Sequence, residues 1–312
     1  MWRNHGLRTA LSSKRCAFVA TLIAVAIGTQ VFGQSGQTEL REPVYRVASE
    51  STATQVAPAA PVPAVANAAA AAGFDLVQQP GEHPLAPTIR TLNSVLAHID
   101  QNVSDYSCTF KKQERVEGDL SDAQTMFMKV RQQPFSVYMY FLGPPTNQGR
   151  EVLFVDGQNE GKMVVLEAGW KRMAGKMNID PTGTLAMRGQ KYPITNVGIR
   201  NLTAKVLAVA ESDAKFQECD VTVNPAVKFG DRSTTMIQVT HPQPRPNFHA
   251  HVWRIFLDNE LKVPIHYDSY LWPEAPGQSP PPESSYTYAN LKINNGLTAR
   301  DFDPTNPAIF QR

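Results

Sequence analysis

The side chains best suited to chemistry are histidines of the C-terminal third, namely His241, His249, His251 and His266. His249 and His251 are two residues apart, so on a strand they would share one face. With Asp258 or Asp268 they could bind a metal, since imidazole and carboxylate are common zinc ligands. No H-E-x-x-H motif occurs, and the spacings fit no zinc class closely. Exposed histidines are the simpler interpretation. We therefore predict no bound metal, and a secreted hydrolase with a metal at His249 and His251 stays an alternative.

Other catalytic signatures are missing from the sequence. It has no G-x-S-x-G nucleophile elbow and no G-x-x-x-x-G-K-[ST] phosphate loop. The carboxylates Glu114, Glu117, Asp119 and Asp122 cluster around a turn, as is typical of a solvated loop. Two glycosidase carboxylates need not be close in the chain, so that class stays open. No residue is predicted to be catalytic, and no cofactor is expected.

The segment DPTGTLAMRGQKYPIT, residues 180 to 195, combines glycines and prolines with few core residues. This composition is typical of a turn-rich connection, with a proline just before the next helix. The alternative is a loop at the mouth of a ligand cavity, where Arg188 and Lys191 would meet an anionic head group. Asp180, Arg188 and Lys191 are therefore candidate residues of a cavity mouth.

Apolar side chains alternate along two neighbouring strands, MFMKV and FSVYMYFL. The inward positions are Met126, Met128 and Val130 on the first strand, and Val137, Met139 and Phe141 on the second. Methionine is flexible and polarisable, so a wall rich in it suits varied apolar ligands. Plain core packing against a helix explains the same alternation. These six residues are candidates for the wall of an apolar cavity.

The elements that would position these residues follow from periodicity. Three-four apolar spacing predicts amphipathic helices over residues 85–103 and 194–213. Strands are predicted at 106–119, 125–134 and 135–145, in a hairpin over 150–169, and in five further stretches between 216 and 294. Nearly all are joined by short turns. This order favours an α+β domain, a meandering antiparallel sheet with helices on one face.

The N-terminal part of the chain differs in composition from the rest. Basic residues precede a short apolar run at 16–28, which predicts a signal peptide over residues 1–33. An uncleaved anchor is the alternative. Residues 34–82 are rich in Ala and Pro and predict a disordered linker. The single folded domain is then 83–312. Export would place the protein in the periplasm or outer cell envelope, where the linker would let the domain reach a membrane surface.

Loss of residues 1–33 changes the charge, because this segment holds four of the 30 basic residues and no acidic residue. The rest of the chain has a small excess of acidic residues, so no nucleic-acid partner is expected. Cys108 and Cys219 would remain in an oxidising compartment. A disulfide and two free thiols both fit the sequence.

The C-terminal stretches HVWRIFLDNELKVPIHYDSYLWP and SSYTYANLKINNGLTARDF resemble the lipoprotein-carrier fold of the LolA and LolB type. The matching positions are Asp258, Pro264, Tyr267, Tyr286, Tyr288, Leu291, Lys292, Asn294, Gly296, Leu297 and Phe302. YSCTFKKQERVEGDLSDAQTMFMKVRQQPFSVYMYFLGP, GREVLFVDGQNEGKM and DPTGTLAMRGQKYPITNVGIRNL are similar to an exported bacterial family of unknown function, DUF1571. The carrier resemblance implies a strongly curved, open antiparallel sheet, or half-barrel, with helices on its concave face and an apolar cavity between them.

Three functions follow as expectations. The first is a non-enzymatic envelope protein that holds a lipid or a lipoprotein acyl chain in the apolar cavity. The second is a structural or protein-interaction module whose core is filled by side chains. The third is the secreted hydrolase with a metal at His249 and His251. In the strand YTYANLKIN, alternation predicts Ala289, Leu291 and Ile293 on one face and Tyr288 on the other.

Overall fold

A computed structural model describes residues 73–310. The predicted signal peptide and most of the predicted linker lie outside the described residues. Within the described part, no helix has both the length and the apolar character needed to cross a membrane.

The packed chain begins before residue 83. Phe74 and Leu76 are buried in the main core. Arg90 of the first helix binds Asp75 and Glu82 at 3.1 and 2.6 Å. Burial of these two large apolar side chains is favourable. The Ala- and Pro-rich stretch before them has few side chains of this kind.

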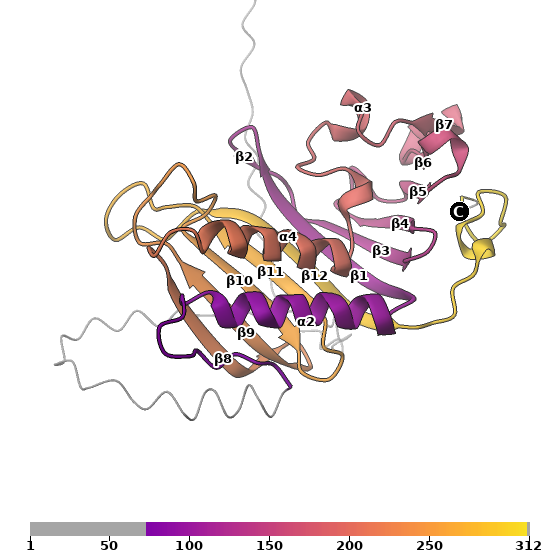
Figure 1. Cartoon of the computed structure of the whole chain (residues 1–312). Helices are drawn as coiled ribbons and strands as arrows, with labels where there is room; N and C mark the ends of the chain where they lie inside the picture. Colours follow the sequence, from indigo (N-terminus) through magenta and orange to yellow (C-terminus); the bar gives the residue numbers. More distant parts are fainter. Residues whose placement is uncertain (1–72, 311–312) are drawn as a thin grey trace, which may run out of the picture. The chain divides into compact units, whose positions relative to one another are not determined.

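The described strands form one antiparallel sheet (Figure 1). Its order is β7-β6-β5-β4-β3-β1-β12-β11-β10-β9-β8, and the short β2 pairs only with β1. The strands are β1 (Asp105–Val116), β2 (Asp119–Leu120), β3 (Gln124–Arg131), β4 (Ser136–Gly143), β5 (Glu151–Val155), β6 (Met163–Leu166), β7 (Lys176–Ile179), β8 (Asp220–Phe229), β9 (Arg232–Thr240), β10 (Val252–Asp258), β11 (Pro264–Tyr270) and β12 (Pro282–Ile293). The sheet consists of two meanders, and the pairing of β1 with β12 joins them.

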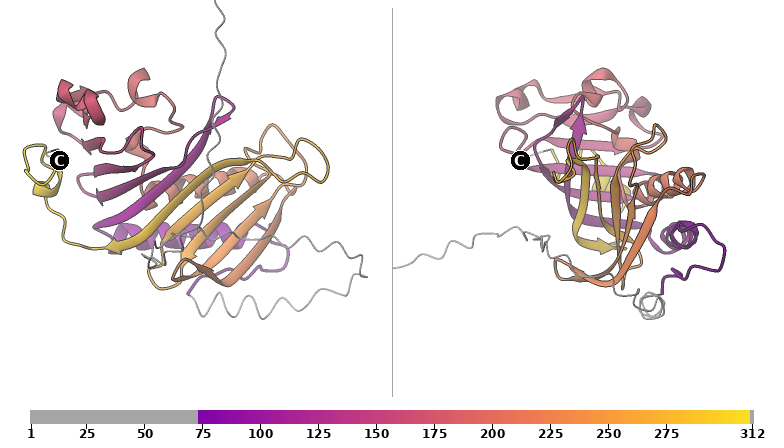
Figure 2. Two further views of the ribbon diagram at one scale, coloured as in Figure 1. Left: turned by 180° about the vertical axis from the view of Figure 1, so that it is seen from behind. Right: turned by 90° about the vertical axis from the view of Figure 1, so that its left-hand side faces the viewer.

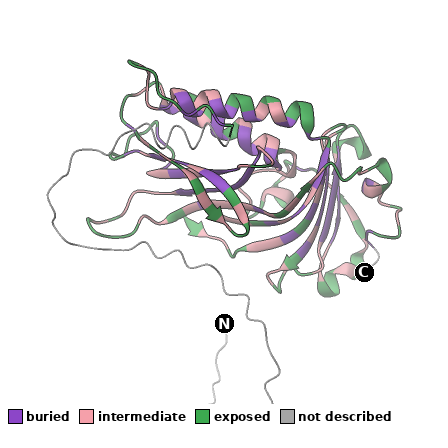
Figure 3. Ribbon diagram, turned by 90° about the horizontal axis from the view of Figure 1, so that it is seen from below, coloured by how far each residue is buried: buried purple, intermediate pink, exposed green. Residues whose placement is uncertain are grey.

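The sheet is curved and does not close, which confirms the predicted fold class (Figures 2 and 3). Two long helices, α2 (Ala86–Asn102) and α4 (Ile199–Asp213), lie side by side on its concave face. Each buries an apolar stripe, such as Leu92, Val95 and Ile99 of α2. In Figure 1 they cross the half of the sheet made by β9–β12 and β1.

The other half, β3–β6, is covered only by short elements. These are the helical turns η2 (Gly169–Ala174), α3 (Thr184–Met187) and η3 (Ile194–Asn196), with the chain between them. A further turn, η1 (Asn159–Gly161), joins β5 to β6. The segment predicted as a helix over 194–213 is thus divided into η3 and α4 at Gly198, whose φ of 113° interrupts the helical path.

The convex face carries a second apolar cluster that the sequence did not predict. The chain after η4 (Ala299–Phe302) returns along β4–β6, and Phe302, Ile309 and Phe310 pack against side chains of these strands. The buried carboxylate of Glu151 accepts the backbone N–H of Phe310 and the hydroxyl of Tyr138, both at 2.6 Å. Both faces of this half of the sheet are therefore covered.

The predicted facing of β12 is wrong beyond Tyr288. Tyr288 is buried in the same core against which Leu291 and Ile293 pack. The reason is a register shift against β1 between Ser107 and Thr109, opposite Asn290, whose φ is 54°. A bulge adds one residue to the strand and reverses the alternation.

Candidate functional site

A cavity of about 380 Å³ lies between the inner face of the sheet and the chain from Pro181 to Lys205. The sheet contributes residues of β1, β3, β4, β5, β6, β7 and β12. η2, α3, η3 and the first turns of α4 contribute the rest. We call the segment 180–198 the lid. The cavity exists because the long helices cover the other half of the sheet and the short lid does not fill the space above this half.

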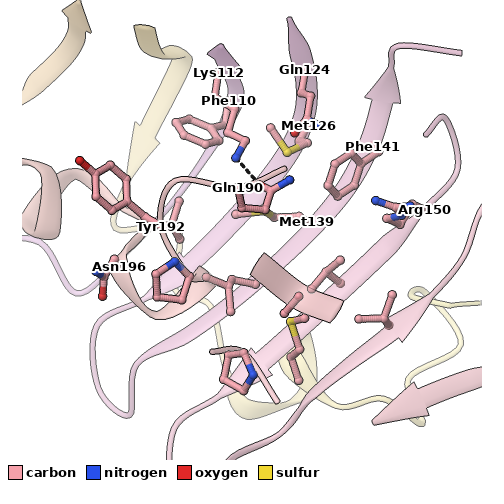
Figure 4. A pocket seen from close by; sticks show the side chains of 18 of the residues that line it. Phe110, Lys112, Gln124, Met126, Met139, Phe141, Arg150, Gln190, Tyr192 and Asn196 are labelled. Carbon is pink, nitrogen blue, oxygen red and sulfur yellow. Dashed lines mark hydrogen bonds between the residues drawn. The ribbon is translucent and has the colours of Figure 1, made fainter. Parts of the chain in front are cut away.

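The wall along the sheet is apolar (Figure 4). Met126, Met139 and Phe141 line it, together with Val152 of β5 and Val165 of β6. The pairing of Met126 with Phe141 in the ladder of β3 and β4 explains why both reach the same cavity. Phe110, Met163 and Tyr288 also line the wall.

The remaining candidate wall residues lie deeper. Met128, Val130 and Val137 point to the same face but are almost completely buried in the main core and do not line the cavity. The contribution of β5 and β6 to the cavity wall was not predicted from the sequence. The hairpin predicted at 150–169 indicates this contribution, because a strand next to 135–145 in a meander must continue the same wall.

The three candidate mouth residues take different positions. Arg188 lines the cavity. Lys191 is turned to the sheet, where its ammonium pairs with Glu283. Asp180 lies outside the lining and accepts hydrogen bonds from the backbone N–H and hydroxyl of Thr182, both at 2.8 Å. These bonds lower the pKa of Asp180.

A buried carboxylate fastens the lid to the sheet. Glu114 of β1 accepts hydrogen bonds from the Tyr286 hydroxyl at 2.7 Å, the Lys112 ammonium at 3.1 Å and the backbone N–H of Lys191 at 3.0 Å. Lys112 also donates to Gln190 of the lid. Burial first, and the charge of Glu114 second, raise the pKa of Tyr286. This network forms the polar end of the cavity.

Further cations surround the opening. Arg150 binds Glu167 at 2.9 Å and stacks on Phe141 with 5.7 Å between the guanidinium carbon and the ring centre. The Lys205 ammonium lies 3.1 Å from the centre of the Tyr192 ring. Burial, and then the charge of Lys191, lower the pKa of Lys205.

Lys171 and Arg188 also line the cavity, and like Lys205 they have no ion-pair partner among residues 73–310. The site thus joins an apolar wall to an opening with an excess of positive charge. Such an arrangement suits an amphiphile whose apolar part enters and whose anionic end stays at the opening.

The candidate metal residues lie apart from this cavity. His249 is exposed, and His251 has Nδ1 2.8 Å from the backbone oxygen of His241. His241 is buried with Nε2 3.3 Å from Asp213. His266 lies between Thr287 and Asp268 on β11 and β12. Within the described part of the chain, no three His, Cys, Asp or Glu side chains form a group that could hold a metal.

The two cysteines are both free thiols buried in the core. Burial raises the pKa of Cys108, and it raises the pKa of Cys219 to about 11, with Asp213 and Asp220 adding to the shift.

Comparison with known proteins gives a family and several distant structures. The model of the family described as "Protein of unknown function (DUF1571)" matches residues 103–309. No curated protein matches the chain.

Solved structures that match this chain include the Mycobacterium tuberculosis lipoprotein LppX (12% identity, TM-score 0.39, 70% of this chain and 100% of that chain). A putative outer membrane lipoprotein-sorting protein domain from Vibrio parahaemolyticus has 12% identity and a TM-score of 0.35, covering 72% and 98%. A LolA superfamily protein from Nitrosomonas europaea has 8% identity and a TM-score of 0.29, covering 68% and 97%. At such scores these likenesses carry no argument about function.

Proposed function

Because the chain belongs to the DUF1571 family, whose function is unknown, we propose a function from the cavity itself. The protein is a non-enzymatic component of the cell envelope that holds an acyl chain of a lipid or lipoprotein between the sheet and the lid. The observation that carries this proposal is the cavity of about 380 Å³, apolar along the sheet and cationic at its opening.

The apolar wall supplies the binding energy. Each methylene that leaves water for an apolar site contributes about 0.8 kcal/mol, so six buried methylenes contribute about 5 kcal/mol before the cost of immobilisation. Met126 and Met139 can adapt to chains of different length and branching. No covalent step and no cofactor is needed for such binding.

The opening supplies the orientation. A carboxylate or phosphate at the end of the acyl chain would meet Arg188 and Lys171, which have no ion pair among the described residues. Arg150 is already bound to Glu167, and Lys112 to Glu114. The predicted signal peptide at residues 1–33 fits this role, since acyl-chain and lipoprotein traffic takes place in the envelope.

The proposal is tested by filling the cavity. Ala186 of α3 lines the cavity, whereas Ala208 of α4 is exposed and does not. Binding of a fluorescent fatty acid should be at least about tenfold weaker for Ala186→Trp, because an indole side chain takes the place of at least two buried methylenes, each worth about 0.8 kcal/mol. Ala208→Trp is the matched control and should bind as the wild type does.

Native mass spectrometry of the protein purified from its own envelope gives a second measurement. We expect a bound lipid mass that dissociates on activation, and its absence from Ala186→Trp. Wild type without bound lipid, together with equal fatty-acid affinity of both tryptophan variants, would contradict the proposal. The second candidate, a structural module with a filled core, would then be preferred, since Met128, Val130 and Val137 are packed solidly.

A further inference from the structure

Three large apolar side chains extend into solvent next to the cavity. Trp170 is 79% exposed, Met173 92% and Leu185 68%, the highest values for large apolar side chains in residues 73–310. Other exposed large apolar residues, such as Leu142 at 44%, are at most half exposed. Trp170 and Met173 belong to η2 and Leu185 to α3. We call these three residues the apolar rim.

The apolar rim belongs to the opening of the cavity. Leu185 lines the cavity itself, and so does Lys171, which stands next to Trp170 on η2. Trp170 lines a shallow depression that shares Arg150, Glu167 and Lys171 with the cavity. In Figure 1, α3 and the strands β6 and β7 on either side of η2 lie together at one end of the domain. A partner that contacts the apolar rim would therefore also contact the opening of the cavity.

The same surface is basic. Residues 168–191 contain five Lys or Arg and a single acidic residue, Asp180. Three of the five are bound to other parts of the chain, namely Arg172 to Glu151, Lys176 to the backbone oxygen of Pro304 and Lys191 to Glu283. The free positive charge beside the apolar rim is therefore that of the other two. Lys171 and Arg188 have no ion pair within the described part of the chain.

We propose that the apolar rim docks on the surface of an anionic lipid bilayer, with the cavity opening toward the lipid. Tryptophan settles at the boundary between head groups and acyl chains, and Met173 and Leu185 would enter the same layer. Lys171 and Arg188 would contact lipid phosphates, an attraction that depends on negative surface charge. A protein partner would match the apolar residues, but the positive charge on the same one-turn elements favours a lipid surface.

This docking goes beyond the proposed function, because it does not need an acyl chain in the cavity. It would supply a route by which a ligand enters without crossing water. The two proposals can therefore fail separately, and the experiment keeps them apart.

The test is co-sedimentation of the full chain with vesicles of phosphatidylcholine alone or mixed with phosphatidylglycerol. Residues 16–28 are apolar in every variant, so all comparisons use the same background. Trp170→Ser with Met173→Ser should weaken binding to the mixed vesicles by about tenfold, because two side chains no longer leave water. Phe127→Ser is the control, since Phe127 is also exposed (37%) but lies on β3.

Two further measurements test the contribution of the positive charge and the insertion of Trp170 into the bilayer. Lys171→Gln with Arg188→Gln should remove most of the preference for phosphatidylglycerol, whereas Lys292→Gln, at an exposed position of β12, should not. Vesicles should shift the tryptophan emission to the blue. Trp170→Phe should reduce the shift and retain most of the binding, because Phe remains apolar, Trp253 is buried, and Trp2 and Trp272 are the same in both proteins.

The outcomes decide the proposal. Ala186→Trp, with its cavity filled, should bind vesicles as the wild type does. If it loses vesicle binding while the double serine variant keeps it, the vesicles report acyl-chain uptake and the docking proposal is overturned. It is also overturned if the wild type does not bind mixed vesicles, if binding is equal with and without phosphatidylglycerol, or if the serine variants bind like Phe127→Ser.

Discussion

Removal of the carboxylate that fastens the lid should destabilise the domain and open the lid. Glu114 is 2% exposed and accepts three hydrogen bonds, from Tyr286, Lys112 and the backbone of Lys191. The change Glu114→Ala leaves all three donors without this acceptor. A buried donor without a partner costs free energy of folding.

The magnitude follows from the contacts. Three hydrogen bonds to a charged group, at about 1.5 kcal/mol each, sum to about 4.5 kcal/mol. Two effects lower this value. Contacts within one network are not additive, and the truncation opens a space beside the cavity, where water can hydrate the Lys112 ammonium and the Tyr286 hydroxyl. We expect a loss of about 2–3 kcal/mol in the free energy of unfolding.

Two further variants calibrate this value. Glu114→Gln keeps one acceptor oxygen, for Tyr286, but its amide NH2 takes the place of the oxygen that accepts from Lys112 and Lys191, so the loss should be about 2 kcal/mol. Glu167→Ala removes the other carboxylate of the cavity wall, whose pairing with Arg150 is partly exposed on both sides. Exposed pairs contribute about 0–1 kcal/mol, so this variant should lose at most about 1 kcal/mol.

Urea unfolding at neutral pH, followed by the fluorescence of the buried Trp253, measures all three variants. Hydrogen exchange gives the local effect: amides of residues 188–198 should exchange faster in Glu114→Ala than in Glu167→Ala, since only the former contacts the lid backbone. Equal losses for the two alanine variants, or unchanged exchange in the lid, would refute the assignment of Glu114 as its fastening point.

Two other predictions concern the frame around the site. Burial alone would raise the pKa of Asp258, but hydrogen bonds from Arg232 and two backbone N–H groups outweigh it and lower the pKa. The stability that the ionised Asp258 contributes is therefore complete above the carboxyl pKa of the unfolded chain, about 4. It is lost as the pH falls through the lower pKa of the folded state. Asp258→Asn should cost about 2 kcal/mol at pH 7 and less at pH 2 in urea unfolding, while the exposed Glu260→Gln should cost little at either pH; a pH-independent loss contradicts this account. Gly198→Ala should cost more than about 2 kcal/mol, because φ is +113° and a Cβ would lie 2.8 Å from the Tyr106 hydroxyl oxygen; a variant as stable as the wild type would show that α4 can begin differently.

Most of the helices and strands could be predicted, because the sequence patterns that indicate them are local. The spacing that predicted a helix over 85–103 gives α2 at Ala86–Asn102. The alternation in MFMKV and FSVYMYFL predicted which side chains share a face, and the pairing of Met128 with Met139 confirms it. Turns and periodicity depend on neighbouring residues, so one sequence is sufficient to detect them.

The errors arise where one residue changes the local rule. Nothing in YTYANLKIN marks Asn290 as the residue with positive φ, although asparagine tolerates that conformation better than most. One bulge there moves Tyr288 to the inner face. β7 is a four-residue edge strand in a segment with many turn formers, so its alternation was too short to detect.

The cavity residues could be predicted only in part, because the sheet alone does not define them. All six candidate wall residues point inward, but Met128, Val130 and Val137 are buried in the main core, whereas Met126, Met139 and Phe141 line the cavity. Which of the two groups stays accessible depends on where the helices cross the strands. That crossing is set by contacts between residues far apart in the chain, such as Tyr106 and Ile199.

The cavity and the apolar rim have one structural origin. α2 has 17 residues and α4 has 15, so each has a stripe long enough to cover several strands. η2 has six residues and α3 has four. Helices of one or two turns cannot bury their apolar side chains and also fill the space over β3–β6. The space therefore stays open as the cavity, and Trp170, Met173 and Leu185 stay outside. A long helix in place of residues 168–198 would remove both features together, so the apolar rim and the cavity are linked by the shortness of the same segment.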